Sequence, residues 1–278
     1  MKPSATTLSL VSDGTIKTDG GAMFGQLPKS AWEQLAAPDR RNRVSLGLNC
    51  LVIKNGDSCV LVDAGLGNKD PEQTKERFGL TRSNLMKSLR AMGLTPRDVT
   101  AVVLTHLHQE HSGGCTRLDR SGEAVPTFPN ATYFIQRKAW EEAASPNERA
   151  CDLYRQEDFL PLKERSQITL LDGDAEVAPG TRVRLTGGHC NGHQMVLVNH
   201  GGERVAFLGD LIPTHHHLGM ACISSTDTFP EDTLAIKKDL VYEAEKCGWL
   251  IVFCHGLETR AGYLEKRKGR LNFRPVEF

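Results

Sequence analysis

The residue types best suited to metal chemistry are concentrated in segment 105–114, which holds three imidazoles and one carboxylate in close succession: His106, His108, Glu110 and His111. His106 and His108 follow an apolar run that predicts a strand, and side chains two positions apart at a strand end can converge on one cation. A turn would bring Glu110 and His111 towards a second position beside it. Imidazole and carboxylate ligands suit Zn, Fe, Mn or Co. The segment therefore predicts a metal site, with a His-rich surface loop as the alternative.

Three more side chains that can bind a metal follow apolar runs typical of strands: His189, Asp210 and His255. Taken singly, each has a structural explanation, because a histidine can hydrogen bond to backbone and an aspartate can cap a turn. Together with the first segment they give four strand ends that carry potential ligands. Strand ends at one edge of an α/β protein are where ligands bind, so we expect all four to meet in one metal centre.

This pattern resembles the metal-binding motif of the metallo-β-lactamase-fold hydrolases. Within that superfamily the chain is most similar to the branch that contains methyl parathion hydrolase and the acyl-homoserine-lactone lactonases. The resemblance extends over nearly the whole chain. The matching motifs, in chain order, are Ser12–Thr15, Leu61–Gly65, His106–His111, Phe128–Ala131, Gly188–His193, Leu208–Ile212 and Gly248–Val276.

The resemblance implies an α/β fold, a four-layer αββα sandwich, with a two-metal site at one edge of the paired sheets. Carried over by position, the ligands of one metal would be His106, His108 and His189, and those of the other would be Glu110, His111 and His255. Asp210 would bridge the two metals. Asp63 matches the strand-end aspartate of the family, which usually accepts a hydrogen bond from a ligating histidine. His193 is expected to support its turn and not to bind metal.

Glu110 departs from the family pattern, which has aspartate at this position. The extra methylene lets glutamate reach a metal only if the loop moves back or the second metal shifts. Three outcomes are open: two metals with adjusted spacing, a weaker second site, or a single metal with Glu110 free as a base. We expect the first, because the other ligands of the second site, His111, Asp210 and His255, are present.

Other histidines and cysteines near the motifs are expected to have roles other than metal binding. The run His215–His217 follows Asp210 and is expected to line the cavity, with His215 and His217 as candidate substrate contacts and no more than one of the three touching substrate. A solvated loop is the alternative. Cys190 and Cys254 each adjoin a predicted ligand, but strand alternation should turn them to the opposite face as core thiols.

The elements that must position these residues alternate between strands and helices along the whole chain. Nine short apolar runs predict strands: Val44–Lys54, Ser58–Val62, Val99–Leu104, Ala131–Ile135, Ile168–Leu171, Arg182–Leu185, Gln194–Asn199, Arg204–Leu208 and Trp249–Cys254. Helices are predicted from a Thr81 cap to Gly93, over Arg137–Ala144, and from Pro230 to Gly248. No linker or low-complexity tract interrupts this order, so residues 1–278 are predicted to form one α/β domain.

The predicted function is metal-dependent hydrolysis. Two divalent ions, Zn first and Mn, Fe or Co as options, would share a hydroxide that attacks the carbonyl or phosphoryl group of a small molecule. Asp210 would hold the metals and move a proton to the leaving group. The resemblance implies lactones, esters or phosphotriesters as substrates. One alternative is an iron-dependent oxidoreductase of the dioxygenase kind, and another is a binding protein whose catalysis Glu110 has weakened.

Composition limits the partners. Lys plus Arg and Asp plus Glu both number 34, and this zero net charge argues against nucleic acid and anionic membranes as partners. The dense basic run Lys266–Arg270 is interpreted as a solvated face. No long apolar run and no amino-terminal apolar region is present, and the eight cysteines include no closely spaced pair. We expect reduced thiols, a cytoplasmic location and a small-molecule substrate, with a homodimer left open.

Overall fold

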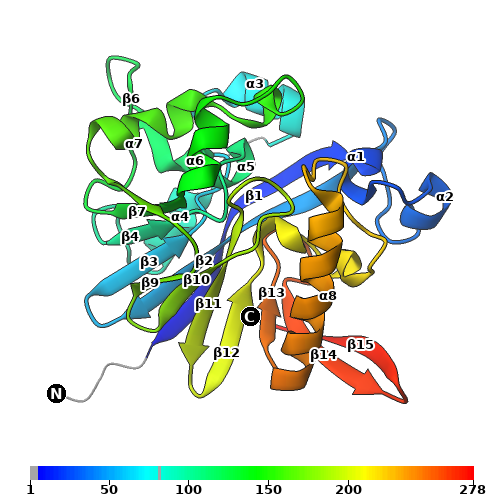
Figure 1. Ribbon diagram of the computed structural model, residues 1–278. Coiled ribbons are helices and arrows are strands. Elements are labelled where there is room, and N and C mark those ends of the chain that lie inside the picture. The colour runs from blue at the N-terminus through cyan, green and yellow to red at the C-terminus, as the bar shows by residue number, and fades with distance from the viewer. Residues whose placement is uncertain (1–5, 81–82) are drawn as a thin grey trace.

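The computed structural model describes residues 6–80 and 83–278, with two large β-sheets at its centre (Figure 1). The first sheet has the strand order β1 (Thr7–Asp19), β2 (Arg43–Asn55), β3 (Ser58–Val62), β4 (Ala101–Val103), β7 (Thr132–Gln136) and β8 (Ile168–Leu171). The second has the order β15 (Arg270–Val276), β14 (Ala261–Arg267), β13 (Leu250–Val252), β12 (Glu203–Phe207), β11 (Gln194–His200), β10 (Thr181–Leu185) and β9 (Ala175–Ala178). A separate short hairpin joins β5 (Thr116–Leu118) to β6 (Ala124–Pro126).

Helices lie on the outer faces of the sheets and in the connections. They are α1 (Gly20–Phe24), α2 (Lys29–Trp32), α3 (Pro71–Phe78), α4 (Leu85–Ala91), α5 (Gln109–Ser112), α6 (Arg137–Ala144), α7 (Leu160–Glu164) and α8 (Pro230–Cys247). None of the helices within the described residues is long and apolar enough to cross a membrane.

The buried apolar side chains form layers. Those between the sheets come from both, for example Val62 and Val103 of the first sheet and Phe207 of the second. On the outer face of the first sheet, residues of α4, α6 and α7 pack against Tyr133 and its neighbours. On the outer face of the second, α8 packs against a cluster that includes Ile251. This order of helix, sheet, sheet and helix confirms the predicted αββα sandwich.

Local sequence accounts for the limits of α8. Pro230 occupies the first turn, where its missing N–H is not needed, and Glu231 and Asp232 favour the positive end of the helix dipole. Gly248 ends the helix in the left-handed conformation, with φ of 63°. The predicted helices at Arg137–Ala144 and Pro230–Gly248 are confirmed. The predicted cap Thr81 lies outside the described residues, and the helix that follows it, α4, begins at Leu85.

The nine predicted strands are all present, with small shifts at their ends. The strands that the sequence did not predict are β1, the hairpin strands β5 and β6, and β14 with the two edge strands of the second sheet, β9 and β15. A bulge between Ser12 and Gly14 interrupts the alternation of β1, which explains why its pattern is weak. The basic run Lys266–Arg270 covers the end of β14, the turn and the first residue of β15, and all of it is exposed, so its interpretation as a solvated face is confirmed.

Strand direction brings the functional residues to one edge. β3 and β4 are parallel, so the residues after them, which include Asp63 and His106, leave the first sheet at the same edge. β12 and β13 are also parallel, and they are followed by Asp210 and His255. β10, which precedes His189, runs antiparallel to β11 and therefore in the same direction as β12.

Candidate metal centre

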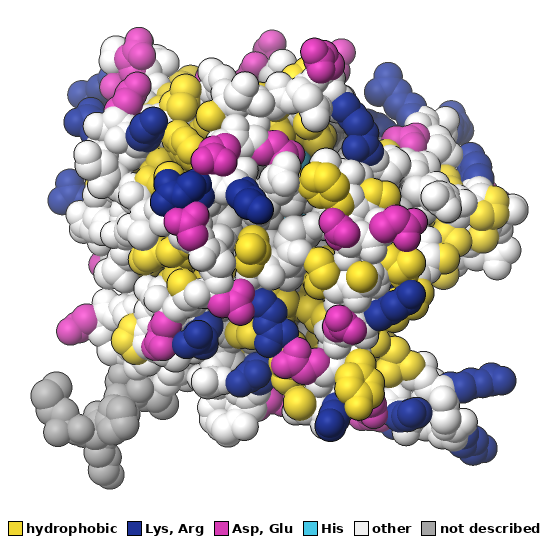
Figure 2. Space-filling view, in the orientation of Figure 1, with side chains coloured by type: hydrophobic (Ala, Val, Ile, Leu, Met, Phe, Trp, Pro, Cys, Tyr) yellow, Lys and Arg dark blue, Asp and Glu magenta, His cyan; other side chains and the backbone are white. Residues whose placement is uncertain are grey.

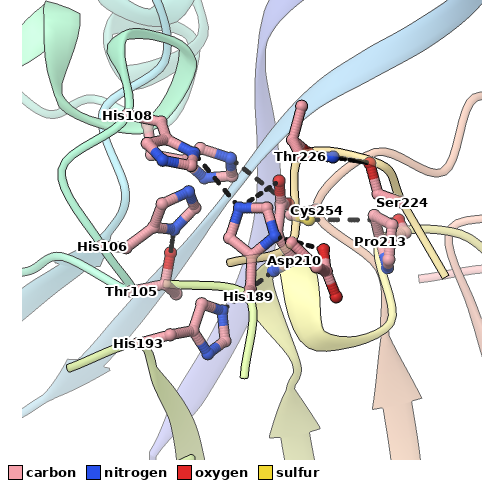
Figure 3. A network of polar contacts seen from close by, with 12 residues as sticks. Thr105, His106, His108, His189, His193, Asp210, Pro213, Ser224, Thr226 and Cys254 are labelled. Carbon is pink, nitrogen blue, oxygen red and sulfur yellow. Dashed lines mark hydrogen bonds and ion pairs between the residues drawn. The ribbon is translucent and has the colours of Figure 1, made fainter. Parts of the chain in front are cut away.

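Two groups of potential ligands converge at this edge. Within each group, one ligand atom from every residue lies within 4.8 Å of the others. The first group is His106, His108, His189 and Asp210, and the second is Glu110, His111, Asp210 and His255. Figure 3 shows the imidazoles of His106, His108 and His189 turned towards one another, with Asp210 beside them. The structure thus brings together all seven residues predicted as ligands, including Glu110.

Asp210 is the residue common to both groups. It lies in a short 3-10 turn, η4 (Gly209–Leu211), directly after β12. Its Oδ1 is 3.2 Å from His255 Nε2 and 3.3 Å from His111 Nε2, and its Oδ2 is 3.5 Å from His189 Nε2. One carboxylate therefore faces imidazoles of both groups, which is the position a bridging ligand would need.

Hydrogen bonds fix the orientation of three of these imidazoles. Nδ1 of His111 is 2.8 Å from Asp63 Oδ2, and Nδ1 of His189 is 2.7 Å from Asp227 Oδ1. Nδ1 of His255 is 2.8 Å from the carbonyl oxygen of Gly47. Each partner is a carboxylate or carbonyl oxygen, so each Nδ1 is placed to donate. A neutral ring then presents the lone pair of its Nε2 towards the centre, as a metal ligand requires.

His106 gives an independent test of whether a metal fits. Its Nδ1 contacts the Thr105 hydroxyl at 3.0 Å, while its buried Nε2 has no hydrogen-bond partner among the described residues. A buried polar atom without a partner is costly unless an ion or water satisfies it. The unpaired atom belongs to a ring in the first ligand group, so the residues present fit a divalent metal.

Burial and neighbouring charges shift the pKa values of the side chains in the centre, some upward and some downward. Burial, together with the neighbouring imidazoles, lowers the pKa of His106 and His108 well below the usual range, which keeps them neutral. Burial also opposes a charge on His111, but the carboxylates of Asp210 and Asp63 outweigh it and raise its pKa well above the usual range. Burial would raise the pKa of Asp210, yet His255 and His111 lower it well below the usual range. The carboxylate thus stays ionised.

Asp63 holds the first ligand segment in place. It has a positive φ of 57°, which is uncommon outside glycine, and its Oδ1 accepts the backbone N–H of Thr105 at 2.8 Å. Its carboxylate also accepts a hydrogen bond from the Thr105 hydroxyl, which in turn contacts His106. One side chain therefore sets the position of His111 directly and that of His106 through Thr105.

The two glycines after the ligand segment are needed for close packing. A Cβ at Gly113 would lie 2.2 Å from the carbonyl oxygen of Leu66, and one at Gly114 would lie 2.0 Å from that of Ala64. Any residue with a Cβ would therefore clash with backbone at both positions. The loop that follows Asp63 thus packs directly against the helix that carries Glu110 and His111.

Both ring nitrogens of His193 are engaged by protein groups. Its Nδ1 is 2.6 Å from the Thr186 hydroxyl, and its Nε2 accepts the backbone N–H of Asp210 at 3.0 Å. It therefore ties the turn after β10 to the backbone of the shared carboxylate.

Cys190 and Cys254 are buried, as predicted for core thiols, and the eight cysteines of the described chain are all free. The expected orientation of Cys254 is wrong, because its Sγ donates to Asp210 Oδ1 at 3.1 Å. β13 ends at Val252, so strand alternation no longer governs position 254.

The run His215–His217 forms the short 3-10 turn η5 (His215–Leu218). His217 is buried, with Nδ1 bonded to the Thr214 hydroxyl at 2.8 Å and Nε2 to the Met23 carbonyl at 3.0 Å. His217 therefore has both ring nitrogens engaged, whereas His215 and His216 are half-buried.

Two cavities adjoin the centre. The smaller, of about 60 Å³, is lined by Glu110, His189, Asp210 and His255 among others. The larger, of about 490 Å³, has all three residues of the run His215–His217 in its wall and shares Met23, Leu46 and His255 with the smaller one. The centre thus opens towards a space large enough for a small organic molecule.

Sequence reasoning missed Asp227, the buried carboxylate that contacts His189. It lies in the irregular segment between η5 and α8 and does not follow a strand, so no spacing rule marks it. The Gly47 carbonyl, which orients His255, was missed for the same reason, since backbone groups leave no signature in sequence.

The sequence matches a known family and several characterised proteins. Residues 46–255 match the model of the metallo-β-lactamase superfamily. An N-acyl homoserine lactonase of Bacillus cereus is 27% identical over 174 residues, covering 56% of this chain and 60% of that protein. The matched part thus spans less than two thirds of this curated relative.

Solved structures cover the whole chain. A probable metal-dependent hydrolase from Staphylococcus aureus superimposes with a TM-score of 0.89 and 27% identity, covering 100% of this chain and 99% of that one. A dizinc quorum-quenching lactonase in complex with a product gives a TM-score of 0.79 at 20% identity, covering 100% and 97%. Since the family model matches most of the chain, this protein belongs to the metallo-β-lactamase superfamily.

Proposed function

We propose that this protein is a metal-dependent hydrolase that uses two divalent ions to cleave a lactone, ester or phosphotriester of a small molecule. The observation that carries the proposal is the position of Asp210, whose two oxygens face imidazoles of both ligand groups. Both sheets supply ligands to this one centre, and residues 1–278 are accordingly proposed to act as one domain. The lactonases and hydrolases among its relatives support the same class of reaction.

The proposed ligand sets follow the two groups. His106, His108 and His189 would hold one ion, Glu110, His111 and His255 would hold the other, and Asp210 would bridge them. Zinc is the first choice, with Mn, Fe and Co as alternatives for the same ligand types. Glu110 is half-buried and close enough to the second group to take part, which supports two metals with adjusted spacing.

When bound, the metals would polarise the substrate oxygen and lower the pKa of a water molecule to about 7. Asp210 is ionised and sits between the two groups, where it can accept a proton and pass it to the leaving group. Glu110 lines the same small cavity and is the second candidate for proton transfer. Asp63 holds His111 and the Thr105 backbone, so it keeps the ligands in place while the proton moves.

The larger cavity is proposed to receive the part of the substrate that does not react. Met23, Phe24 and Leu46 give it an apolar wall, and His215 is the candidate for a polar contact. Since His217 has both nitrogens engaged, we assign it to the wall and not to hydrogen bonding with substrate. Cationic and anionic side chains are interspersed over the face seen in Figure 2. This mixed surface charge is consistent with a neutral substrate. The free thiols suit a reducing compartment such as the cytoplasm.

Metal analysis combined with a hydrolysis panel tests the proposal. The panel contains a lactone, an aryl ester, a phosphotriester, a phosphodiester and a β-lactam. We expect two metals per chain and hydrolysis of one of the first three, lost on chelation and restored by Zn, Mn or Co. Full activity after metal removal would reject the proposal, and a one-metal stoichiometry that excess metal cannot raise would reject the two-metal form.

Two further measurements separate the alternatives. Iron in the purified protein together with oxygen uptake would favour the oxidoreductase. Tight ligand binding without turnover, with turnover gained in Glu110→Asp, would favour a binding protein weakened by the glutamate.

A further inference from the structure

Asp227 is a buried carboxylate outside the predicted ligands that contacts the centre directly. Its Oδ1 is 2.7 Å from His189 Nδ1, and its Oδ2 accepts the Thr233 hydroxyl of α8 at 2.7 Å. Asp227 is 2% exposed, His189 and Thr233 are 1% exposed. Both carboxylate oxygens are engaged, so the acceptor that faces His189 is fixed in direction.

The backbone around Asp227 is also joined to the segment that carries His189. The N–H of Thr228 donates to the carbonyl of His189 at 2.8 Å, and the N–H of Phe229 donates to that of Gly188 at 2.9 Å. A Cβ at Gly188 would lie 2.6 Å from the Thr233 hydroxyl oxygen, so the close approach needs glycine. His189 and the segment before α8 therefore form one packed unit.

Two basic side chains, Lys237 and Arg149, donate hydrogen bonds to the backbone of the segment before α8. Lys237 of α8 is fully buried, and its ammonium donates to the carbonyls of Gly219 and Cys222, each at 2.8 Å. Arg149 donates to the carbonyl of Ser225 at 2.8 Å and to that of Asp227 itself at 3.2 Å. The carboxylate is thus presented by a loop that is anchored at several points.

We propose that Asp227 is a positioning residue for His189, and that it sets the affinity of the metal held by His106, His108 and His189. The inference rests on the proposed metal centre. By donating to Asp227, Nδ1 of His189 fixes the tautomer in which Nε2 faces the shared carboxylate Asp210 at 3.5 Å. Asp63 does the same for His111, so each ligand group contains one histidine held by a buried carboxylate.

The test is metal titration of the full chain with Zn and with Co, by calorimetry and by competition with a chromophoric chelator. The variants are Asp227→Ala and Asp227→Asn, and Asp239→Asn removes an exposed carboxylate of α8 as the control. We expect Asp227→Ala to weaken one of the two metals by about 10- to 100-fold, the usual effect of losing such a partner. Asp227→Asn should lose less, because its amide oxygen can still accept from Nδ1, and the control should match the wild type.

Cobalt spectra provide a readout that a purely structural role would not change. We expect altered absorption of the bound Co in Asp227→Ala, with the affinity of the other metal retained. If Asp227→Ala fails to fold, as judged by circular dichroism, Asp227→Asn and Thr233→Val take its place, since Thr233→Val frees the second carboxylate oxygen.

The two proposals fail separately. Wild-type protein that binds two metals but hydrolyses nothing in the panel would overturn the proposed function and leave the role of Asp227 standing. Variants that bind both metals with wild-type affinity and an unchanged Co spectrum would overturn the role of Asp227, whatever the hydrolysis. Equal weakening of both metals would also overturn it, because a positioning residue for His189 should act on one.

Discussion

The candidate metal centre has two halves, one from each sheet, and they are built in different ways. The first sheet supplies its ligands from one short segment after β4, and the carboxylate that orients His111, Asp63, ends the adjacent parallel strand β3. The second sheet supplies His189, Asp210 and His255 from three separate strand ends, and the carboxylate that orients His189 lies in an irregular loop. The first half therefore depends on local sequence and strand pairing, and the second depends on how distant segments pack.

Loss of Asp210 should have the largest effect, because it is the one side chain common to both ligand groups. We expect Asp210→Ala to reduce hydrolysis to the detection limit and to lower the metal content. The imidazoles of His111 and His255 would also lose the charge that faces them. Turnover and metal content per chain are the measurements, with Asp239→Asn as the matched control. Unchanged turnover in Asp210→Ala would mean that the active site lies elsewhere.

Lys69 tests how firmly the first half is anchored. Its ammonium lies 2.9 Å from Asp158 Oδ1, with both side chains 1% exposed, and donates to the carbonyls of Gly113 and Thr116 just after the ligand segment. Lys69→Met leaves the carboxylate of Asp158 buried without its partner, which should cost about 3–5 kcal/mol in the free energy of unfolding. Urea denaturation measures this loss.

The double variant Lys69→Met with Asp158→Leu is the control for that experiment. Because it removes both charges, it should recover most of the lost stability. A single-variant loss below about 1 kcal/mol, in the range of an exposed pair, would contradict the assigned anchoring.

Asp63→Asn compares the two orienting carboxylates directly. We expect a loss of metal affinity smaller than the roughly 10- to 100-fold loss that full removal of such a partner causes, because the amide oxygen of asparagine can still accept from His111 Nδ1. The metal held with His111 should be weakened most, because Asp63 contacts His111 directly and His106 only through Thr105. Competition titration with Zn, run beside the Asp227 variants, is the measurement. If Asp63→Asn and Asp227→Asn weakened the same metal most, the assignment of one orienting carboxylate to each ligand group would be wrong.

His217, in the wall of the larger cavity, should give the smallest effect, which is on the pH dependence of stability. Burial lowers its pKa to about 4 from 6.5, so the folded protein keeps it neutral while the unfolded chain takes up a proton. The stability that depends on neutral His217 is fully present above about pH 6.5 and is lost as the pH falls towards about 4. Between about pH 6.5 and about pH 5.5 the loss should be about 1 kcal/mol.

Chemical denaturation of the wild type and of His217→Gln at several pH values measures that slope. The variant should show a shallower decline over the same interval, since glutamine does not titrate. Parallel declines would show that His217 contributes nothing to the pH dependence.

The sequence alone predicted much of this protein, for physical reasons that differ between regions. Short apolar runs gave the central strands, because a strand buried on both faces must be apolar throughout. The edge strands β9 and β15 escaped detection, since an edge strand is partly solvated and its composition is mixed. Proline and glycine marked the limits of α8 because they act on the backbone directly.

Residue type and order determined the candidate ligands, because a histidine or carboxylate that follows an apolar strand can be recognised in the sequence. Only the tertiary structure decided what holds them: the carbonyl of Gly47 behind His255, the loop carboxylate Asp227 behind His189, and the thiol of Cys254 against Asp210. These contacts join segments far apart in the chain. Their partners are backbone groups or loop residues whose role comes from position and not from any repeating pattern.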